Sequence, residues 1–299
     1  MSLLHETMFR MMYEAKEGYD SDNPPDYVAR REQGKARPVY KKRTITVKKY
    51  NKNGVQGEFL MNSRNPSEDI ILCIHGGGFV AGTAQESRRL TTWLVEKSGY
   101  NVYAADYRLA PEYPFPQGAN DCLEAYRMLL ETYDADHICL LGDSAGGNLV
   151  LSVVLQAQDA GLPLPKCVVA ISPCVQFDRQ YPSFDENEKS DCMLCSNFIQ
   201  EVKEIYLQSK PEYLKHPYAA PLYGDVSNFP PTYITVSDSE CLYDDAREMA
   251  KVLKAAGREC TLDVYHGLMH VFPTIVIFPE SKIALRKIKD FMDCQFGRS

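Results

Sequence analysis

One pentapeptide constrains the fold of this chain more than any other feature. Residues 142–146 read Gly-Asp-Ser-Ala-Gly, with Ser144 at the centre and a glycine two positions away on each side. The apolar run 138–141 before it is typical of a buried strand, and the apolar run 149–155 after it is typical of a helix. This order predicts a tight strand–turn–helix in which a Cβ at either glycine would clash. Such a turn presents the Ser144 hydroxyl at the carboxyl edge of a sheet.

A second glycine-rich segment lies upstream of this turn. Residues 75–79 read His-Gly-Gly-Gly-Phe and directly follow the apolar run 70–74, a predicted strand. Successive glycines allow backbone N–H groups to converge on an oxyanion. Taken alone, each segment is also compatible with an ordinary turn or a phosphate-binding loop. In this order they match a nucleophile turn preceded by an HGGG-type oxyanion loop.

The rest of the chain alternates strands with helices. We expect an antiparallel hairpin at 43–50 and 55–61, then further strands at 70–74, 100–105, 138–141, 167–171, 232–236 and 262–265. We expect helices at 117–133, after Ser144, at 197–208, at 244–256 and at 281–296. This alternation predicts an α/β fold with a mostly parallel central sheet flanked by helices.

Two regions interrupt this alternation. Residues 1–40 combine a helical apolar spacing with a polar, proline-containing stretch at 20–38, and we interpret them as a helical lead-in. Between 173 and 230, almost 60 residues separate two predicted strands where a short crossover would suffice. An insertion of this kind is typical of a lid or a substrate-binding cap. Its aromatic residues either line an apolar site or pack in the core; they are Phe177, Tyr181, Phe184, Phe198 and Tyr206.

Composition excludes several classes of protein. The 299 residues carry a net charge of −7, whereas a nucleic-acid-binding protein would need a basic face. The sequence contains no apolar run of the roughly 20 residues that a membrane-spanning helix requires. The first 20 residues lack the continuous apolar core of a signal peptide. These features predict a cytoplasmic protein.

The ten cysteines do not form a recognisable framework. Only Cys192 and Cys195 have a C-x-x-C spacing, and no second pair completes the roughly four ligands of a zinc site. A redox motif would be expected at a helix N-terminus in a βα unit, and this alternative stays open. We expect free thiols and no metal.

Four segments together resemble the hormone-sensitive-lipase family of α/β-hydrolase esterases. They are His-Gly-Gly-Gly-Phe at 75–79, Tyr-Arg-Leu-Ala-Pro-Glu at 107–112, Gly-Asp-Ser-Ala-Gly-Gly at 142–147 and Gly-Leu-Met-His-Val-Phe at 267–272. They occur in the order in which the family has them. The resemblance implies a single α/β-hydrolase domain over 1–299, with a cap formed by 1–40 and about 175–225.

The resemblance assigns roles to two residues of the predicted site. Ser144 is expected to be the nucleophile, and His270 to be the general base and then the general acid. His266 is a near neighbour of His270, but it lies too close to the end of the last predicted strand.

Backbone amides and two supporting residues complete this predicted arrangement. The N–H groups of Gly77, Gly78 and Ala145 are expected to form the oxyanion hole. His75 is expected to hold the glycine loop by hydrogen bonds, and Asp143 to brace the neighbouring turns.

The acidic partner of His270 departs from the commoner pattern of the family. The family motif is acid-x-Leu-x-Asp, and the frame that fits this chain places Glu240 at the acid position, where Asp is usual. A Glu can orient the imidazole as an Asp does, if the loop accommodates one more methylene. Asp238, directly after the predicted strand, is the alternative. Asp244 and Asp245 are explained as caps at the start of a helix.

These expectations define a carboxylic ester hydrolase that acts on small, short-acyl esters through an acyl-enzyme, without a cofactor. An acetyl esterase or deacetylase acting on sugar or amide substrates, with the same residues, is the close alternative. A non-catalytic ligand receptor is a different class, which the presence of Ser144, His270 and a carboxylate disfavours. The expected partner is a small-molecule ester, not a nucleic acid or a membrane. The resemblance also allows a homodimer.

Overall fold

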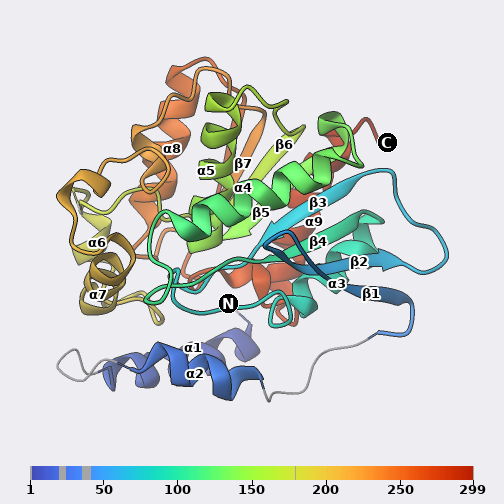
Figure 1. The fold of residues 1–299 in the computed structure, drawn as a ribbon. Coiled ribbons are helices and arrows are strands. Elements are labelled where there is room, and N and C mark those ends of the chain that lie inside the picture. The colour runs from blue at the N-terminus through green and yellow to red at the C-terminus, as the bar shows by residue number, and fades with distance from the viewer. Residues whose placement is uncertain (1, 20–24, 36–41, 179, 299) are drawn as a thin grey trace.

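The centre of the molecule is one eight-stranded sheet, seen in a computed structural model that describes residues 2–19, 25–35, 42–178 and 180–298. The strand order is β1-β2-β4-β3-β5-β6-β7-β8 (Figure 1). The strands are β1 (Ile45–Lys52), β2 (Val55–Asn62), β3 (Ile70–Ile74), β4 (Asn101–Asp106), β5 (Ile138–Asp143), β6 (Cys167–Ile171), β7 (Thr232–Ser237) and β8 (Cys260–Tyr265).

The sheet is mixed but mostly parallel. β1 pairs with β2, and β2 with β4, in antiparallel fashion, which confirms the predicted hairpin. All pairs from β4 to β8 are parallel. The carboxyl ends of these parallel strands therefore share one edge of the sheet, where α/β folds place their ligand sites.

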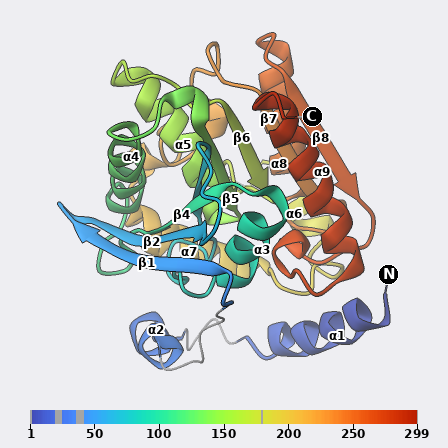
Figure 2. The same cartoon turned by 90° about the vertical axis from the view of Figure 1, so that its right-hand side faces the viewer.

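Helices cover both faces of the sheet, which explains why its central strands are apolar without interruption. On one face lie α4 (Gln117–Leu130), α5 (Ala145–Asp159) and α8 (Tyr243–Ala255). On the other face lie α3 (Arg88–Ser98) and α9 (Pro279–Gln295) (Figure 2). Alternate residues of β3 serve the two layers, because side chains in a strand point to opposite faces in turn. Leu72 packs in the first layer and Cys73 in the second.

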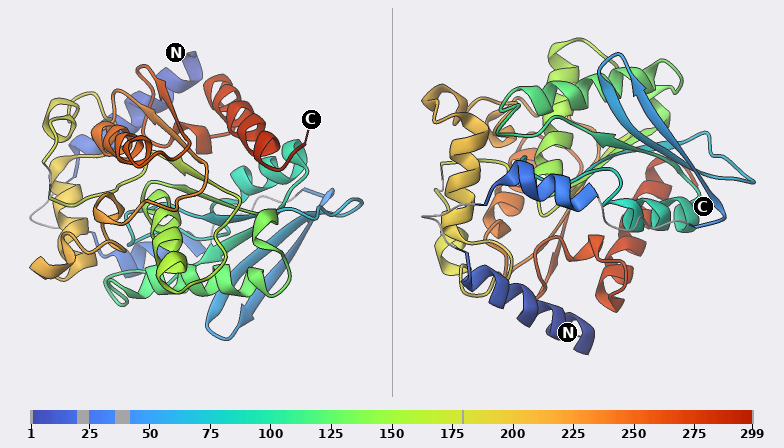
Figure 3. Two further views of the ribbon diagram at one scale, coloured as in Figure 1. Left: turned by 90° about the horizontal axis from the view of Figure 1, so that it is seen from above. Right: turned by 60° about the horizontal axis from the view of Figure 1, so that its bottom comes forward.

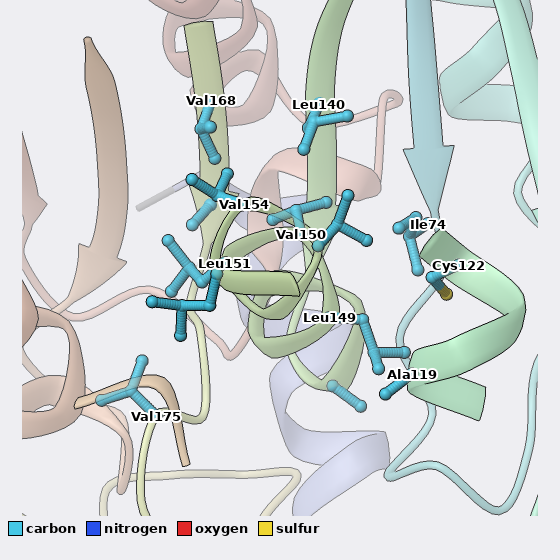
Figure 4. Packing of buried hydrophobic residues seen from close by; sticks show 14 of the residues in the cluster. Ile74, Ala119, Cys122, Leu140, Leu149, Val150, Leu151, Val154, Val168 and Val175 are labelled. Carbon is cyan, nitrogen blue, oxygen red and sulfur yellow. The ribbon is translucent and has the colours of Figure 1, made fainter. Parts of the chain in front are cut away.

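Helix α5 is the best-buried helix of the first layer. It is enclosed from Ala145 to Ala157. Figure 4 shows its side chains Leu149, Val150 and Val154 lying against residues of β3, β5 and β6. Full burial of each such side chain contributes roughly 1.5–3 kcal/mol. The helix that follows Ser144 is therefore fixed firmly to the sheet.

The lead-in and the insertion lie near the carboxyl edge. The lead-in forms α1 (Leu3–Glu17) and α2 (Tyr27–Lys35), and the insertion forms α6 (Ser183–Glu186) and α7 (Ser196–Leu207). Figure 3 shows α1, α2 and α7 on the same side of the molecule. The predicted polar stretch at 20–38 lies in part outside the described residues.

Helices α3 and α4 differ from expectation. Helix α3 was not predicted, although Ser87 precedes it and Gly99 ends it in the left-handed conformation. Helix α4 ends at Leu130 rather than 133, because the next three residues form a turn. Short 3₁₀ turns add the remaining elements: Ala135–His137, Pro211–Tyr213, Pro221–Tyr223 and Phe272–Thr274.

Two sequence-based expectations concern the whole chain. Within the described segments, no helix is both long and apolar enough to cross a lipid bilayer. All ten cysteines are free, as predicted, and Cys192 and Cys195 are among them. Cys195 is the residue that precedes the first turn of α7.

Candidate active site

Ser144 lies on a strained turn between β5 and α5. Its backbone has φ +52° and ψ −117°, a combination that costs a non-glycine residue roughly 1–3 kcal/mol. The turn is as tight as predicted. A Cβ on Gly142 would lie 2.2 Å from the Gly146 carbonyl oxygen, and one on Gly146 would lie 2.1 Å from the Ile74 carbonyl oxygen. The glycines therefore permit the close packing that turns the Ser144 hydroxyl away from the helix.

His270 reaches Ser144 from a loop after β8. Its Nε2 is 2.9 Å from Ser144 Oγ, although 126 residues separate the two in the chain. The imidazole is 3% exposed, so water competes little for this contact. This distance and orientation suit transfer of the hydroxyl proton to the ring.

Glu240 holds the other nitrogen of the ring. Its Oε2 is 2.6 Å from His270 Nδ1. Its Oε1 accepts hydrogen bonds from Ser237 N–H at 2.7 Å and from Ser172 Oγ at 2.9 Å. The carboxylate is fully buried, yet both oxygens are bonded. The loop after β7 thus accommodates the extra methylene of a Glu.

Asp238, the alternative acid, does not contact His270. It accepts from His266 Nδ1 at 2.8 Å and from Gly267 N–H at 3.2 Å. His266 is 94% exposed at its side chain. The two carboxylates of the loop after β7 therefore belong to two separate acid–histidine pairs.

Asp244 and Asp245 lie in the first turn of α8, but the expectation that they cap that helix is wrong. Asp244 accepts from the Ser183 N–H at 3.0 Å, and Asp245 accepts from the Val175 N–H at 2.8 Å. Burial raises the pKa of Asp245 to about 7. Both carboxylates therefore bind the backbone of segment 173–230 to α8 instead of capping the N–H groups of α8.

Electrostatics at this site favour a basic imidazole. Burial alone would lower the pKa of His270, but the hydrogen bond and charge of Glu240 raise it above its ordinary value. The charges of Asp191 and Asp143 act in the same direction. This is the tuning that a general base requires.

The three amides predicted to bind an oxyanion lie beside Ser144. Gly77 and Gly78 line the cavity that contains the Ser144 hydroxyl, and both have positive φ, at +113° and +61°. Ala145 is the first residue of α5, where helix geometry leaves the N–H without an intrahelical partner. Across the described residues, the N–H groups of Gly77 and Gly78 donate to no backbone carbonyl, although the Gly77 carbonyl itself accepts from the Val80 and Ala81 N–H groups.

His75 and Asp143 lie around the glycine loop. His75 Nδ1 is 2.7 Å from the Gly76 carbonyl oxygen, and its ring stacks on Tyr107 at 4.4 Å between centroids. Tyr107 in turn donates to the His75 carbonyl at 2.9 Å. Burial raises the pKa of Asp143, whereas the charge of His75 and the amide of Gly76 oppose this shift. Asp143 therefore braces the loop from the β5 side.

Two residues that support the site were missed in the sequence. Ser172 directly follows β6, and besides bonding Glu240 it accepts from the Val271 N–H at 3.3 Å. Because Ser172 directly follows a predicted strand of the parallel sheet, its place at the carboxyl edge beside β5 could have been inferred from the sequence. Asp191 is buried and accepts from the Cys241 N–H at 2.9 Å and the Leu194 N–H at 2.9 Å. No motif marks Asp191.

Two cavities of unequal size meet at Ser144. The larger has a volume of about 790 Å³ and includes His270 in its wall. Met12 and Tyr27 of the lead-in, and Phe198 of the insertion, also line it. Polar side chains also line it, among them Arg31, Asn51, Gln56, Glu58 and Asp106.

The smaller cavity has a volume of about 40 Å³ and an apolar wall. Phe177 and Phe198, two of the aromatic residues singled out in the sequence, lie in that wall. The others pack in the core: Phe184 and Tyr206 are buried, and Tyr181 is partly buried. In the part of the chain that the structure describes, no three His, Cys, Asp or Glu side chains are grouped to hold a metal ion.

Comparisons with known proteins agree with this architecture. A family profile described as "alpha/beta hydrolase fold" matches residues 71–274. The chain is 33% identical over 229 residues to the acetyl-hydrolase of Streptomyces hygroscopicus, and the match covers 76% of each protein. The crystal structure of EstE5 soaked with p-nitrophenyl butyrate has a TM-score of 0.91 at 29% identity, covering 99% of this chain and 100% of that one.

A further crystal structure specifies the family. It is that of an esterase from the bacterial hormone-sensitive lipase family, with a TM-score of 0.88, 31% identity and 99% coverage of each chain. The fold and the residues at its carboxyl edge define an α/β-hydrolase. The chain belongs to the hormone-sensitive-lipase family of these hydrolases and is a serine carboxylesterase.

Proposed function

We propose that Ser144, His270 and Glu240 form the catalytic triad of this esterase. Ser144 Oγ attacks the ester carbonyl carbon while its proton moves to His270 Nε2. Glu240 stabilises the imidazolium that results. The N–H groups of Gly77, Gly78 and Ala145 bind the oxyanion, and each such donor is worth roughly 2.7–4 kcal/mol of transition-state stabilisation.

The second half of the reaction uses the same groups. Collapse of the tetrahedral intermediate breaks the ester C–O bond, and His270 gives its proton to the departing alcohol. Water then attacks the acyl carbon on Ser144, with His270 again taking a proton. Collapse of this second tetrahedral intermediate breaks the bond between the acyl carbon and Ser144 Oγ, and His270 returns its proton to Oγ. The products are the carboxylic acid and the free hydroxyl of Ser144. The observation that carries the proposal is the continuous chain of contacts, 2.9 Å from Ser144 to His270 and 2.6 Å from His270 to Glu240.

The two cavities support a preference for short acyl groups. The alcohol must leave beside His270, which protonates it, and His270 lines the larger cavity. The acyl group then occupies the smaller cavity, whose wall includes Ala145 and Phe198. A volume of about 40 Å³ admits only a few non-hydrogen atoms. Acetyl to butyryl esters fit this limit.

The polar side chains that line the larger cavity favour one refinement of this function. Gln56 and Asp106 offer hydrogen-bonding groups to the alcohol portion, which an alkyl alcohol would leave unused. A short-acyl ester of a polar alcohol, such as an acetylated sugar, uses them. The similarity to an acetyl-hydrolase agrees with this second candidate.

We also propose that residues 1–40 and 175–225 form a cap on a single α/β-hydrolase domain. The support is that Met12, Tyr27, Met193 and Phe198, from both segments, line the larger cavity. The ten free thiols support a reducing compartment, the cytoplasm.

An acyl-chain series tests the proposed function. We expect kcat/KM for p-nitrophenyl esters to be highest from acetate to butyrate and to fall steeply towards octanoate. Phe198→Ala, which enlarges the smaller cavity, should move the maximum to longer chains. Ser144→Ala should reduce turnover to background. Turnover retained by Ser144→Ala would refute the mechanism, and an octanoate maximum in the native enzyme would refute the acyl assignment.

A further inference from the structure

A histidine of the lead-in helix touches the backbone next to His270. His5 of α1 is fully buried, and its Nε2 accepts a hydrogen bond from the Met269 N–H at 3.2 Å. Its ring packs edge-on against Phe278, with 5.2 Å between the ring centroids. Met269 directly precedes His270 in the chain. The lead-in therefore contacts the backbone of the proposed catalytic loop itself.

The loop that carries His270 is held at its amides by side chains from other elements. The Leu268 N–H donates to Ser237 Oγ at 2.9 Å, and the Val271 N–H donates to Ser172 Oγ at 3.3 Å. Ser237 ends β7 and Ser172 follows β6, so both acceptors come from the sheet. These two bonds fix the loop on either side of His270.

The Met269 amide lies between those two points, and its acceptor comes from outside the sheet. Met269 is 1% exposed, so without His5 its N–H would be buried with no water to bond. Among the described residues, Nδ1 of His5 has no hydrogen-bond partner. Apart from the bond from Met269, the His5 ring contacts the aromatic rings of Phe9, which also belongs to α1, and of Phe278.

We propose that His5 is a positioning residue for His270: by accepting from the Met269 N–H it fixes the backbone from which the catalytic imidazole projects. This inference rests on the proposed function of His270. Through this bond, α1 supports the backbone that carries His270 as well as covering the site. A shift of about 1 Å in a catalytic group can cost on the order of 10²-fold in rate, so one bond in this place matters.

The neutral form of His5 is the one that can accept this bond. Burial lowers the pKa of His5, against the opposing charges of Glu280 and Glu6. The ring is therefore uncharged at neutral pH, and its free lone pair faces Met269.

Helix α1 also has anchors that do not involve His5. Ser2 donates through its N–H and its hydroxyl to the Glu280 carboxylate, the latter at 2.9 Å. Lys16 Nζ donates to the Asp191 carbonyl oxygen at 2.6 Å. Substitution of the His5 side chain therefore removes the acceptor without removing the docking of the helix.

The test compares variants that separate the acceptor from the packing. His5→Gln places an amide oxygen near the position of Nε2 and keeps the acceptor. His5→Phe keeps a ring against Phe278 and removes the acceptor. His5→Asn keeps an acceptor that is one methylene too short. Ser2→Ala removes the hydroxyl that donates to Glu280 and accepts from the His5 N–H, so it weakens the anchoring of α1 while the His5 imidazole remains.

For each variant, kcat and KM are measured with p-nitrophenyl butyrate, together with the rate of Ser144 labelling by a fluorophosphonate. We expect His5→Phe to lower kcat and the labelling rate roughly tenfold, with KM changed less than twofold. His5→Asn should behave like His5→Phe, and it decides the matter if His5→Phe does not fold. His5→Gln and Ser2→Ala should stay within twofold of the native enzyme.

Three results would overturn the inference. One is a native kcat in both His5→Phe and His5→Asn. Another is a loss in His5→Gln as large as that in His5→Phe. The third is an equal loss in Ser2→Ala, which would assign the effect to helix docking alone. A native enzyme without esterase activity would instead refute the proposed function, so the two failures are distinguishable.

Discussion

Two acid–histidine pairs lie at the carboxyl edge of the sheet, and they differ in burial more than in geometry. Glu240 is 2.6 Å from His270 Nδ1, and Asp238 is 2.8 Å from His266 Nδ1. The side chains of the first pair are 0% and 3% exposed, whereas those of the second are 34% and 94% exposed. A short contact between an acid and a histidine therefore does not by itself identify a catalytic pair.

The surroundings of the two pairs explain the difference. The second oxygen of Glu240 is bonded by Ser172 and Ser237, and the second nitrogen of His270 faces Ser144. The imidazole of His266 instead projects into water, where screening makes an ion pair worth little. The buried pair is oriented and has a substrate-facing partner, and the exposed pair has neither.

Replacing the carboxylate of each pair with its amide should give the largest difference in kcat between the two pairs. Glu240→Gln removes the charge that stabilises the imidazolium and disturbs the tautomer, so kcat should fall roughly 10⁴-fold. Asp238→Asn should leave kcat within twofold. Both variants are assayed with p-nitrophenyl acetate at pH 8. The reverse ranking would transfer the catalytic role to Asp238.

The pH dependence of activity should report the buried pair. In the proposed mechanism, attack requires neutral His270, and the pKa of His270 is raised above its ordinary value of 6.5. As the pH falls through that raised pKa, the ring gains a proton and kcat/KM decreases by about tenfold per pH unit. The midpoint of this decrease is expected above pH 6.5, and Asp238→Asn should not move it. A midpoint below 6.5 would contradict the effect assigned to Glu240.

Ser172→Ala should weaken the buried pair without removing it. The variant loses the donor to Glu240 and the acceptor for the Val271 amide, each a contact of a buried group. A hydrogen bond to a charged group contributes roughly 1.5–3 kcal/mol, so kcat/KM should fall about tenfold or more. Ser190→Ala is the matched control, because its hydroxyl contacts the Ser239 carbonyl on the Asp238 side of the loop. Equal effects of the two variants would show a general loosening of the loop.

His266→Gln should have the smallest effect. The side chain is almost fully exposed and bonds only the carboxylate of the exposed pair among the described residues. We expect kcat/KM within twofold of the native value at each pH. A tenfold loss would mean that the exposed pair participates in the reaction.

Much of the fold could be predicted because apolar runs and glycine turns are local signals. The strand 70–74 is apolar throughout since helices cover both of its faces, and the sequence displays this directly. Helix α3 was missed because it begins with two arginines and only Leu90, Leu94 and Val95 mark its inner face.

The residues of the candidate site also differ in how far the sequence predicts them. Ser144 and the glycine loop follow from short motifs with a steric reason for every glycine. Choosing Glu240 over Asp238 depended on a motif frame, since both follow the same strand and only the fold separates their partners. Asp191 had no signal at all, because its contact with Cys241 joins residues 50 positions apart.

Covalent trapping of the nucleophile tests the central claim most directly. The native enzyme is treated with a fluorophosphonate, and the modified peptide is identified by mass spectrometry. We expect one adduct per chain, on Ser144, formed at the native rate in Asp238→Asn and at least 100-fold more slowly in His270→Gln and Glu240→Gln. An adduct on another residue, or labelling of His270→Gln at the native rate, would show that Ser144 is not activated by the buried pair.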